Sequence, residues 1–229
     1  RKLILFLYKM GENMTTKQKL AVFLNLAAAG VQLYATVILI IKRSWGAFQY
    51  YTMDSNIFAA ITSIFLIFAL LSKGEVSKKI RNFRYYSTCC VTVTFIVVIT
   101  ILVPIDGWHT LTTRLFKGTD LWLHTVGPLL NIFSFLFLEG SAELDKKENL
   151  KALIPTLIYA VIAIALNLAR VIYGPYVFLK VYEQGVLMTF VWIVLISILV
   201  YGIAFLLKLG NTKINAKKYP VKEIINPVK

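Results

Sequence analysis

Six long apolar blocks dominate the sequence, and short polar connections separate them. A helix needs about 20 apolar residues to cross a bilayer, and these blocks approach that length. Only 16% of the 229 residues are charged, too few to cover a soluble domain of this size. The sequence therefore predicts an all-α integral membrane protein with six transmembrane helices. They are expected at Leu20–Ile41, Tyr50–Leu71, Tyr86–Val103, Asp120–Leu138, Ala152–Tyr173 and Gln184–Leu207.

The positions of Lys and Arg predict the orientation of these helices. Of the 25 such residues, 19 lie on the side of the two termini and 5 on the opposite side, while Arg170 lies within the fifth block. Cytoplasmic segments carry the excess of Lys and Arg, so both termini are expected in the cytoplasm. The net charge of +14 then reflects contacts with anionic lipid, and no nucleic-acid partner is expected.

The chain divides into three parts. Residues 1–19 are expected to form a cytoplasmic leader, residues 20–207 the six-helix domain and residues 208–229 a basic cytoplasmic tail. The leader lacks the small-residue cleavage site of a signal peptide. Since the connections are too short for a soluble catalytic module, any chemistry must lie among the helices.

Metal and cofactor motifs are absent from the sequence. Cys89 and Cys90 are adjacent, and they are expected to act as small apolar residues at a helix end, with palmitoylation as the alternative. A metal held by His124, His109 and an aspartate would lack any known ligand spacing. We therefore expect neither a metal nor a cofactor.

Polar residues gather at the outward end of three blocks. At about 1.5 Å per residue, Thr52 of the second block and His124 of the fourth lie at comparable depths. Ionisable groups are costly in lipid, so those in the cluster should face the bundle interior and line one outward-facing cavity. The candidate residues are Thr52, Asp54, Ser55 and Asn56 in the second block, Asp120, His124 and Asn131 in the fourth, and Asn167, Arg170 and Tyr173 in the fifth.

Each of these residues also has an ordinary structural role open to it. A Thr in a membrane helix often bonds its own backbone, and an Asp near a helix start often serves that start. Arg170 can extend to the membrane surface, and Tyr173 and Tyr176 fit an interfacial aromatic belt. The convergence of three blocks at one end favours a functional site over these separate roles.

Three short motifs carry a family resemblance. They are Tyr51-Thr52-Met53-Asp54-Ser55-Asn56, the stretch Leu121-Trp122-Leu123-His124-Thr125-Val126-Gly127-Pro128-Leu129-Leu130, and the turn Tyr173-Gly174-Pro175-Tyr176-Val177-Phe178. In this order they resemble the bacterial six-span branch related to the FAR-17a/androgen-induced membrane protein family, over residues 20–207. The resemblance implies a bacterial plasma-membrane location.

The animal members of that family are intramembrane hydrolases of fatty acid esters of hydroxy fatty acids. They depend on one threonine, thought to be the nucleophile, and on one histidine. By motif position the resemblance assigns these roles to Thr52 and His124. The sequence departs from the animal pattern in the Asp54-Ser55-Asn56 that follows the threonine, which leaves the substrate less well defined than the residue pair.

Two classes of function follow from these observations. In the first, His124 activates Thr52 to attack a lipid ester, Asp54 or Asp120 orients the imidazole, and Ser55, Asn56, Asn131 or Arg170 stabilises the oxyanion. In the second, the same cavity binds or transports a lipid or small acidic solute, with Arg170 as the anion anchor. A relative that keeps the scaffold and has lost the chemistry is a third possibility. Membrane lipids are the expected partners, and the oligomeric state is left open.

Overall fold

The computed structural model describes residues 14–73 and 76–216, and in these ranges every regular element is helical. Six helices are long and apolar enough to cross a membrane, which confirms the predicted number. They lie at Thr16–Gln49, Tyr51–Ser72, Lys78–Asp106, Gly118–Leu138, Glu148–Leu168 and Val181–Asn215. The chain is thus a multi-pass membrane protein.

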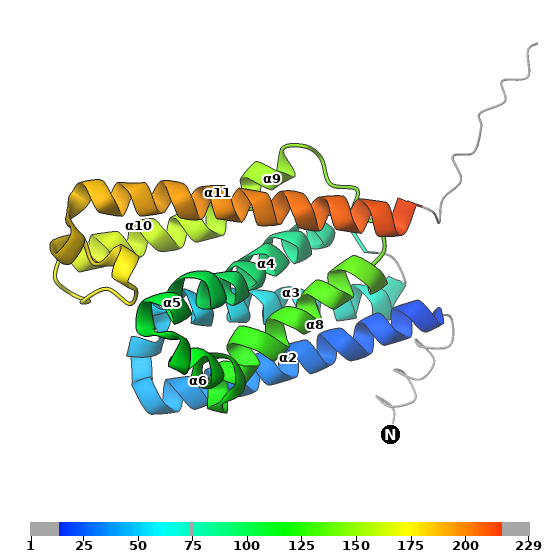
Figure 1. Ribbon diagram of the computed structural model, residues 1–229. Helices are drawn as coiled ribbons and strands as arrows, with labels where there is room; N and C mark the ends of the chain where they lie inside the picture. Colours follow the sequence, from blue (N-terminus) through cyan, green and yellow to red (C-terminus); the bar gives the residue numbers. More distant parts are fainter. Residues whose placement is uncertain (1–13, 74–75, 217–229) are drawn as a thin grey trace, which may run out of the picture.

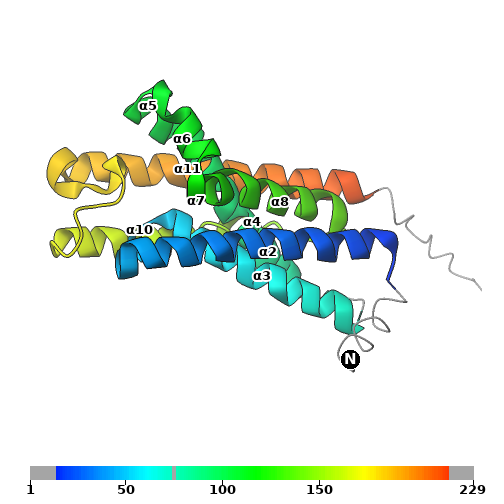
Figure 2. The ribbon, with the colours of Figure 1, turned by 90° about the horizontal axis from the view of Figure 1, so that it is seen from below.

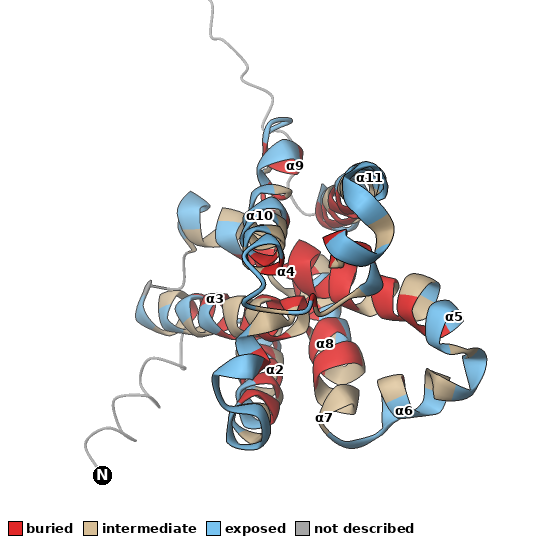
Figure 3. Cartoon of the chain, turned by 90° about the vertical axis from the view of Figure 1, so that its left-hand side faces the viewer, coloured by how far each residue is buried: buried red, intermediate tan, exposed pale blue. Residues whose placement is uncertain are grey.

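The central helix is α4 (Lys78–Val97), which has neighbours on all sides (Figures 1 and 3). On one side lie α2 (Thr16–Arg43), α3 (Tyr51–Lys73) and α8 (Gly127–Phe133). On the other lie α10 (Ile154–Leu168) and α11 (Val181–Asn215). Because it is enclosed in this way, α4 carries the largest buried fraction of the six spans, 56%.

Several predicted boundaries were wrong. Helix α2 begins inside the expected leader, because Thr15 and Gln18 form a capping box at its start. Helix α11 extends through Asn215, eight residues into the expected tail. Residues 1–13 and 217–229 of the leader and tail lie outside the described part of the chain.

The two cysteines were also misplaced by the prediction. Cys89 and Cys90 are fully buried in the middle of α4, where they pack in the main apolar core. The long helix made by α4 and its continuation begins at Lys78, eight residues earlier than expected, so this pair lies well inside the bundle. Palmitoylation would require a thiol that reaches the lipid, and neither does.

The two ends of the bundle carry different polar residues, and we call them the His124 end and the Arg84 end. The His124 end carries the connections at residues 44–50, 107–117 and 169–180, at the left of Figure 1. From this end α5 (Val103–Asp106) and α6 (Leu111–Phe116) project sideways (Figure 2). The Arg84 end carries residues 76–77 and the connection at residues 139–147.

The fourth span is irregular at the candidate site. It comprises α7 (Gly118–Asp120), the wide π-helical turn η4 (Leu121–Val126), then α8 and a second π-helical stretch, η5 (Ser134–Leu138). Pro128 lacks an N–H, and its ring would crowd the carbonyl of His124 four residues earlier. The helix therefore widens just before Pro128, at the turn that carries His124.

Candidate active site

The side chains of Thr52 and His124 lie within hydrogen-bonding distance. Thr52 Oγ1, in the first turn of α3, is 3.3 Å from Nε2 of His124 in η4. The two residues are 72 positions apart in the chain, and packing of α3 against the fourth span brings them together. His124 is buried, with 8% of its surface exposed, so water competes little for this contact.

The backbone of α6 determines which nitrogen of His124 carries a hydrogen. His124 Nδ1 is 2.8 Å from the carbonyl oxygen of Arg114, and Thr125 donates to the next carbonyl, that of Leu115, also at 2.8 Å. The last carbonyls of a helix have no partner inside the helix, so the short α6 offers both as acceptors. A carbonyl can only accept, which places the hydrogen on Nδ1. In the neutral ring, Nε2 is then left as an acceptor for the Thr52 hydroxyl.

Asn56 connects the two helices that carry this pair. Its amide nitrogen donates to the carbonyls of Thr52, at 2.8 Å, and of Leu123, at 3.1 Å. Its amide oxygen accepts from Nε2 of Gln32 in α2, at 2.9 Å. Asn56 is fully buried, so these bonds hold three helices at fixed spacing without competition from water.

A polar cavity of about 290 Å³ opens at the pair. We call it the histidine cavity. This volume far exceeds the roughly 10–15 Å³ that one water needs, so the cavity has room for solvent or for a polar group of a substrate. Its polar lining comprises Arg43, Tyr50, Thr52, Asp106, Arg114, Asp120, His124 and Tyr176.

The two arginines that line this cavity differ in whether they have a carboxylate partner. Arg114 forms an ion pair with Asp106. Arg43 lies over the ring of Tyr50, 4.9 Å from its centroid, and it makes no ion pair with a carboxylate within the described part of the chain. Arg43 is therefore available to an anionic group entering the cavity.

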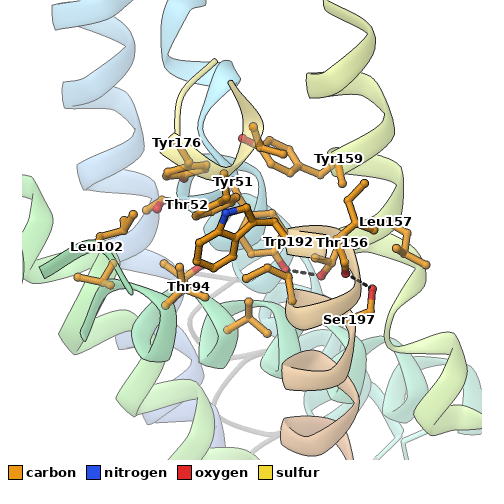
Figure 4. A pocket seen from close by; sticks show the side chains of 18 residues that line it. Tyr51, Thr52, Thr94, Leu102, Thr156, Leu157, Tyr159, Tyr176, Trp192 and Ser197 are labelled. Atoms are coloured by element: carbon orange, nitrogen blue, oxygen red, sulfur yellow. Dashed lines mark hydrogen bonds between the residues drawn. The ribbon is translucent and has the colours of Figure 1, made fainter. Parts of the chain in front are cut away.

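A second cavity, which we call the apolar cavity, is shown in Figure 4, and Thr52 lines it as well as the histidine cavity. It has a volume of about 60 Å³ and an almost wholly apolar wall formed by α4, α10 and α11. Thr52, Leu102 and Tyr176 line both cavities. The Thr52 hydroxyl thus lies where a polar compartment and an apolar one join.

Tyr176 is a member of the site that the sequence assigned to the aromatic belt. It lies in the connection between α10 and α11, its ring stacks on Phe178, and it lines both cavities together with Thr52. Burial raises the pKa of Tyr176 to about 12, so the phenol keeps its proton near neutral pH. The only sequence signal for Tyr176 is its place in the turn that carries the family resemblance.

Two of the other predicted site residues, Asp120 and Asn56, lie beside the pair, and two more, Ser55 and Asp54, do not line the histidine cavity. Asp120 lines the histidine cavity and Asn56 holds the helices, as described. The Ser55 hydroxyl forms a hydrogen bond with the hydroxyl of Thr94 in α4, at 2.9 Å. Asp54 is half-buried on α3 and does not line the histidine cavity. The expected orienting carboxylate is thus replaced at Nδ1 by the carbonyl of Arg114.

Asn131 belongs to a different cluster at the Arg84 end. Seven residues along a helix cover about 10 Å, so the shared face with His124 does not give a shared depth. Asn131 accepts hydrogen bonds from the guanidinium of Arg84, at 2.9 Å, and from Ser63, at 3.4 Å. Arg84 is in turn paired with Glu139, an arrangement that the sequence analysis missed because Arg84 was counted among the cytoplasmic loop charges.

The fifth span does not contribute to the histidine cavity. Helix α10 ends at Leu168, and Arg170 adopts a positive φ of 59° beyond it. Arg170 is exposed and lies over the ring of Tyr182, and Tyr173 bonds Glu183. Asn167 ties the connection together by accepting from the backbone N–H of Val181. These residues line a separate surface depression, so only the second and fourth of the three predicted spans reach the histidine cavity, which the first and third spans and the Tyr176 turn also line.

Among the described residues, no three His, Cys, Asp or Glu side chains gather closely enough to hold a metal ion. The arrangement offers a hydroxyl, an imidazole and a phenol beside two cavities, and these groups suit acyl transfer.

Comparisons with known proteins add no family assignment. No protein-family model matches the chain, and neither a curated protein nor a solved structure matches it.

Proposed function

We propose that this membrane protein hydrolyses lipid esters, with Thr52 as the nucleophile and His124 as the general base. The observation that carries the proposal is the 3.3 Å contact between Thr52 Oγ1 and His124 Nε2, combined with the bond from Nδ1 to the Arg114 carbonyl. A threonine hydroxyl is a weak nucleophile until a base removes its proton, and this ring presents its basic nitrogen to that hydroxyl.

The proposed reaction proceeds in two halves. Thr52 Oγ1 attacks the ester carbonyl while His124 Nε2 takes its proton, and the resulting imidazolium gives that proton to the departing alcohol. A water molecule, deprotonated by the same ring, then attacks the acyl-threonine, and the imidazolium returns the proton to Thr52 Oγ1 as the fatty acid leaves. The Arg114 carbonyl stabilises the imidazolium through Nδ1, as a carboxylate does in other hydrolases.

The oxyanion formed in each half needs a hydrogen-bond donor. Tyr176 lines both cavities beside Thr52, and its raised pKa keeps it protonated. A phenol in this position can donate to the developing negative charge, as side-chain donors do in other acyl-transfer sites.

The substrate class is a fatty acyl ester whose second half carries an acid, similar to a fatty acid ester of a hydroxy fatty acid. Arg43 supports this choice, because it lines the histidine cavity with no carboxylate partner among the described residues. The three motifs that resemble the FAR-17a/androgen-induced family point to the same chemistry. With both termini in the cytoplasm of a bacterial plasma membrane, the ester enters from the outer leaflet.

The test is ester hydrolysis by purified protein in nanodiscs. Fluorogenic esters and a branched fatty acid ester are offered to wild type, Thr52→Ala and His124→Ala, with Thr113→Ala, on the exposed α6, as the matched control. We expect turnover in wild type and the control, and a loss of about 1000-fold or more in the two site variants with unchanged melting temperatures. Full activity of folded Thr52→Ala would refute the nucleophile. Absence of turnover on every ester would favour binding or transport of a small acid by the same cavity.

A further inference from the structure

The apolar cavity differs sharply in chemistry from the histidine cavity next to it. Its wall is formed mainly by aliphatic and aromatic side chains, including Val97 of α4, Ala160 of α10, and Trp192 and Ile196 of α11 (Figure 4). Leu157 also lines it and is exposed on the surface of α10. This part of the wall lies in the fifth and sixth spans, so hydrocarbon surrounds it and the cavity lies next to the lipid-facing side of the bundle.

The position of Thr52 gives the two cavities a common reaction point. A molecule with one arm in each cavity would have its centre beside Thr52, because Thr52, Leu102 and Tyr176 line both cavities. An ester of a long-chain acid has one apolar arm and one more polar arm, joined at the reacting carbonyl. Its apolar arm matches the wall of one cavity and its polar arm the charges of the other.

On the basis of the proposed function, we infer that the apolar cavity holds the acyl chain of the substrate. Trp192 and Ile196 determine the chain length that is accepted, since both lie on the α11 wall of this narrow space. The acyl chain reaches the site sideways from the bilayer between α10 and α11, without leaving the hydrocarbon. The leaving alcohol, with its acid group, occupies the histidine cavity.

The physical basis for this assignment is shape as well as polarity. A hydrocarbon chain already dissolved in lipid gains little from a second apolar environment, so selection by length must come from packing against a fixed wall. Adding bulk to that wall should exclude long chains, and removing bulk should admit them. One methylene in such a pocket changes the rate ratio by roughly 10-fold or more.

The first experiment measures chain-length preference. Nitrophenyl acetate, octanoate and palmitate are hydrolysed by wild type, Ile196→Trp and Trp192→Ala in nanodiscs. Ile198→Trp is the matched control, because it places the same bulk on the same helix at an exposed position. We expect the palmitate-to-acetate rate ratio to fall by about 10-fold or more in Ile196→Trp, to rise in Trp192→Ala and to stay at the wild-type value in the control. Identical profiles in all four folded proteins would overturn the inference.

A second experiment measures occupancy without turnover. In Thr52→Ala, the tryptophans at positions 45, 108 and 122 are replaced by Phe, which leaves Trp192 as the only fluorophore of its kind. A bromopalmitoyl ester is then added, since bromine quenches indole fluorescence on contact. We expect saturable quenching that an excess of unbrominated palmitoyl ester reverses. Quenching that rises linearly without saturation would show only lipid contact and would overturn the inference.

The two experiments separate the inference from the function on which it rests. Saturable quenching with no turnover by wild type would keep the acyl site and refute the hydrolase. Turnover with unchanged chain-length profiles and linear quenching would keep the hydrolase and refute the acyl site.

Discussion

Asn56 is the residue on which the geometry of the candidate site most depends. It has no direct contact with the reacting groups, but its amide nitrogen holds the carbonyl of Thr52 and that of Leu123, the residue before His124. Its oxygen is occupied by Gln32. All three atoms that Asn56 satisfies are polar and lie deep in the bundle, where an unpaired group is expensive.

Replacing Asn56 with Ala should impair both stability and rate. We expect a loss of about 1–3 kcal/mol of unfolding free energy for the groups left unpaired. The value of kcat should fall further than KM changes, because Thr52 and His124 lose their fixed spacing. Thermal melts and steady-state kinetics in nanodiscs measure the two effects. Ser55→Ala, which removes the neighbouring bond to Thr94, is the control. An Asn56→Ala protein with wild-type kcat would rule out the positioning role.

At the scale of elements, proline explains the two π-helical turns that border the candidate site. Pro128 follows η4, and Pro104 follows the π-helical turn η2 (Val98–Leu102) in the third span. In each case the proline ring opposes a carbonyl four residues earlier, and the wider turn accommodates it. The turn before Pro128 carries His124, and the turn before Pro104 ends at Leu102, which lines both cavities. The site is thus built at two departures from the regular α-helix.

Replacing Pro128 with Ala should separate the geometry of His124 from the stability of the fold. The regained N–H and the missing ring allow η4 to tighten into an α-helix, which rotates His124 away from Thr52. We expect an unchanged or higher melting temperature and a loss of kcat of about 100-fold. Pro155→Ala in the first turn of α10, where proline is well tolerated, should leave kcat unchanged. Wild-type activity in Pro128→Ala would show that the π-helical turn is dispensable.

The close approach of α2 and α8 depends on the glycine before that proline. A Cβ at Gly127 would lie 2.8 Å from Cγ of Gln32 and 2.8 Å from the carbonyl oxygen of Trp122. Gly127→Ala should therefore destabilise the protein by about 1–3 kcal/mol, since the backbone atom cannot move aside. Gly202→Ala in α11 meets nothing within 4 Å and should be neutral or stabilising, because Ala is the better helix former. Melting temperatures of the two variants in the same detergent test this contrast, and equal values would contradict it.

At the scale of the whole molecule, the two ends of the bundle differ in how their polar groups are arranged: one end has a cavity and the other a buried ion pair. The His124 end holds a polar cavity with the Thr52–His124 contact at its wall. The Arg84 end holds a closed network, in which Arg84 donates to both oxygens of Glu139, to Asn131 and to Ser63. The side chain of Arg84 is 0% exposed and that of Glu139 is 7% exposed. The network joins the start of α4, the middle of α3 and the end of the fourth span.

Breaking this ion pair should destabilise the entire bundle. Arg84→Met leaves the Glu139 carboxylate buried without its cation, which should cost about 3–5 kcal/mol. Adding Glu139→Leu should recover much of that loss, because no charge then remains buried. Asp145→Ala removes the exposed pair with Lys78 and should have little effect. Chemical unfolding in mixed micelles measures all three, and a wild-type midpoint for Arg84→Met would refute a structural role for the pair.

The sequence by itself determined the class of the protein. Six apolar blocks of membrane-crossing length give six helices, because a chain in hydrocarbon must satisfy its backbone hydrogen bonds within each segment. The same reasoning put Thr52 and His124 at similar depths, since rise per residue is fixed in a helix. Depth along each helix can therefore be read from residue number, and the structure agrees for these two residues.

Only the tertiary structure decided which groups meet around that depth. The sequence carried no signal that the carbonyl of Arg114 would hold His124, because any residue in that position offers the same backbone atom. Asn131 and Arg170 were predicted at a cavity that they do not line, because Asn131 lies about two helical turns from His124 and Arg170 lies beyond the end of α10. Arg84 was counted with the loop charges, but packing buries it beside Glu139. Helix rotation, local widening and backbone acceptors depend on neighbouring helices, and no single segment encodes them.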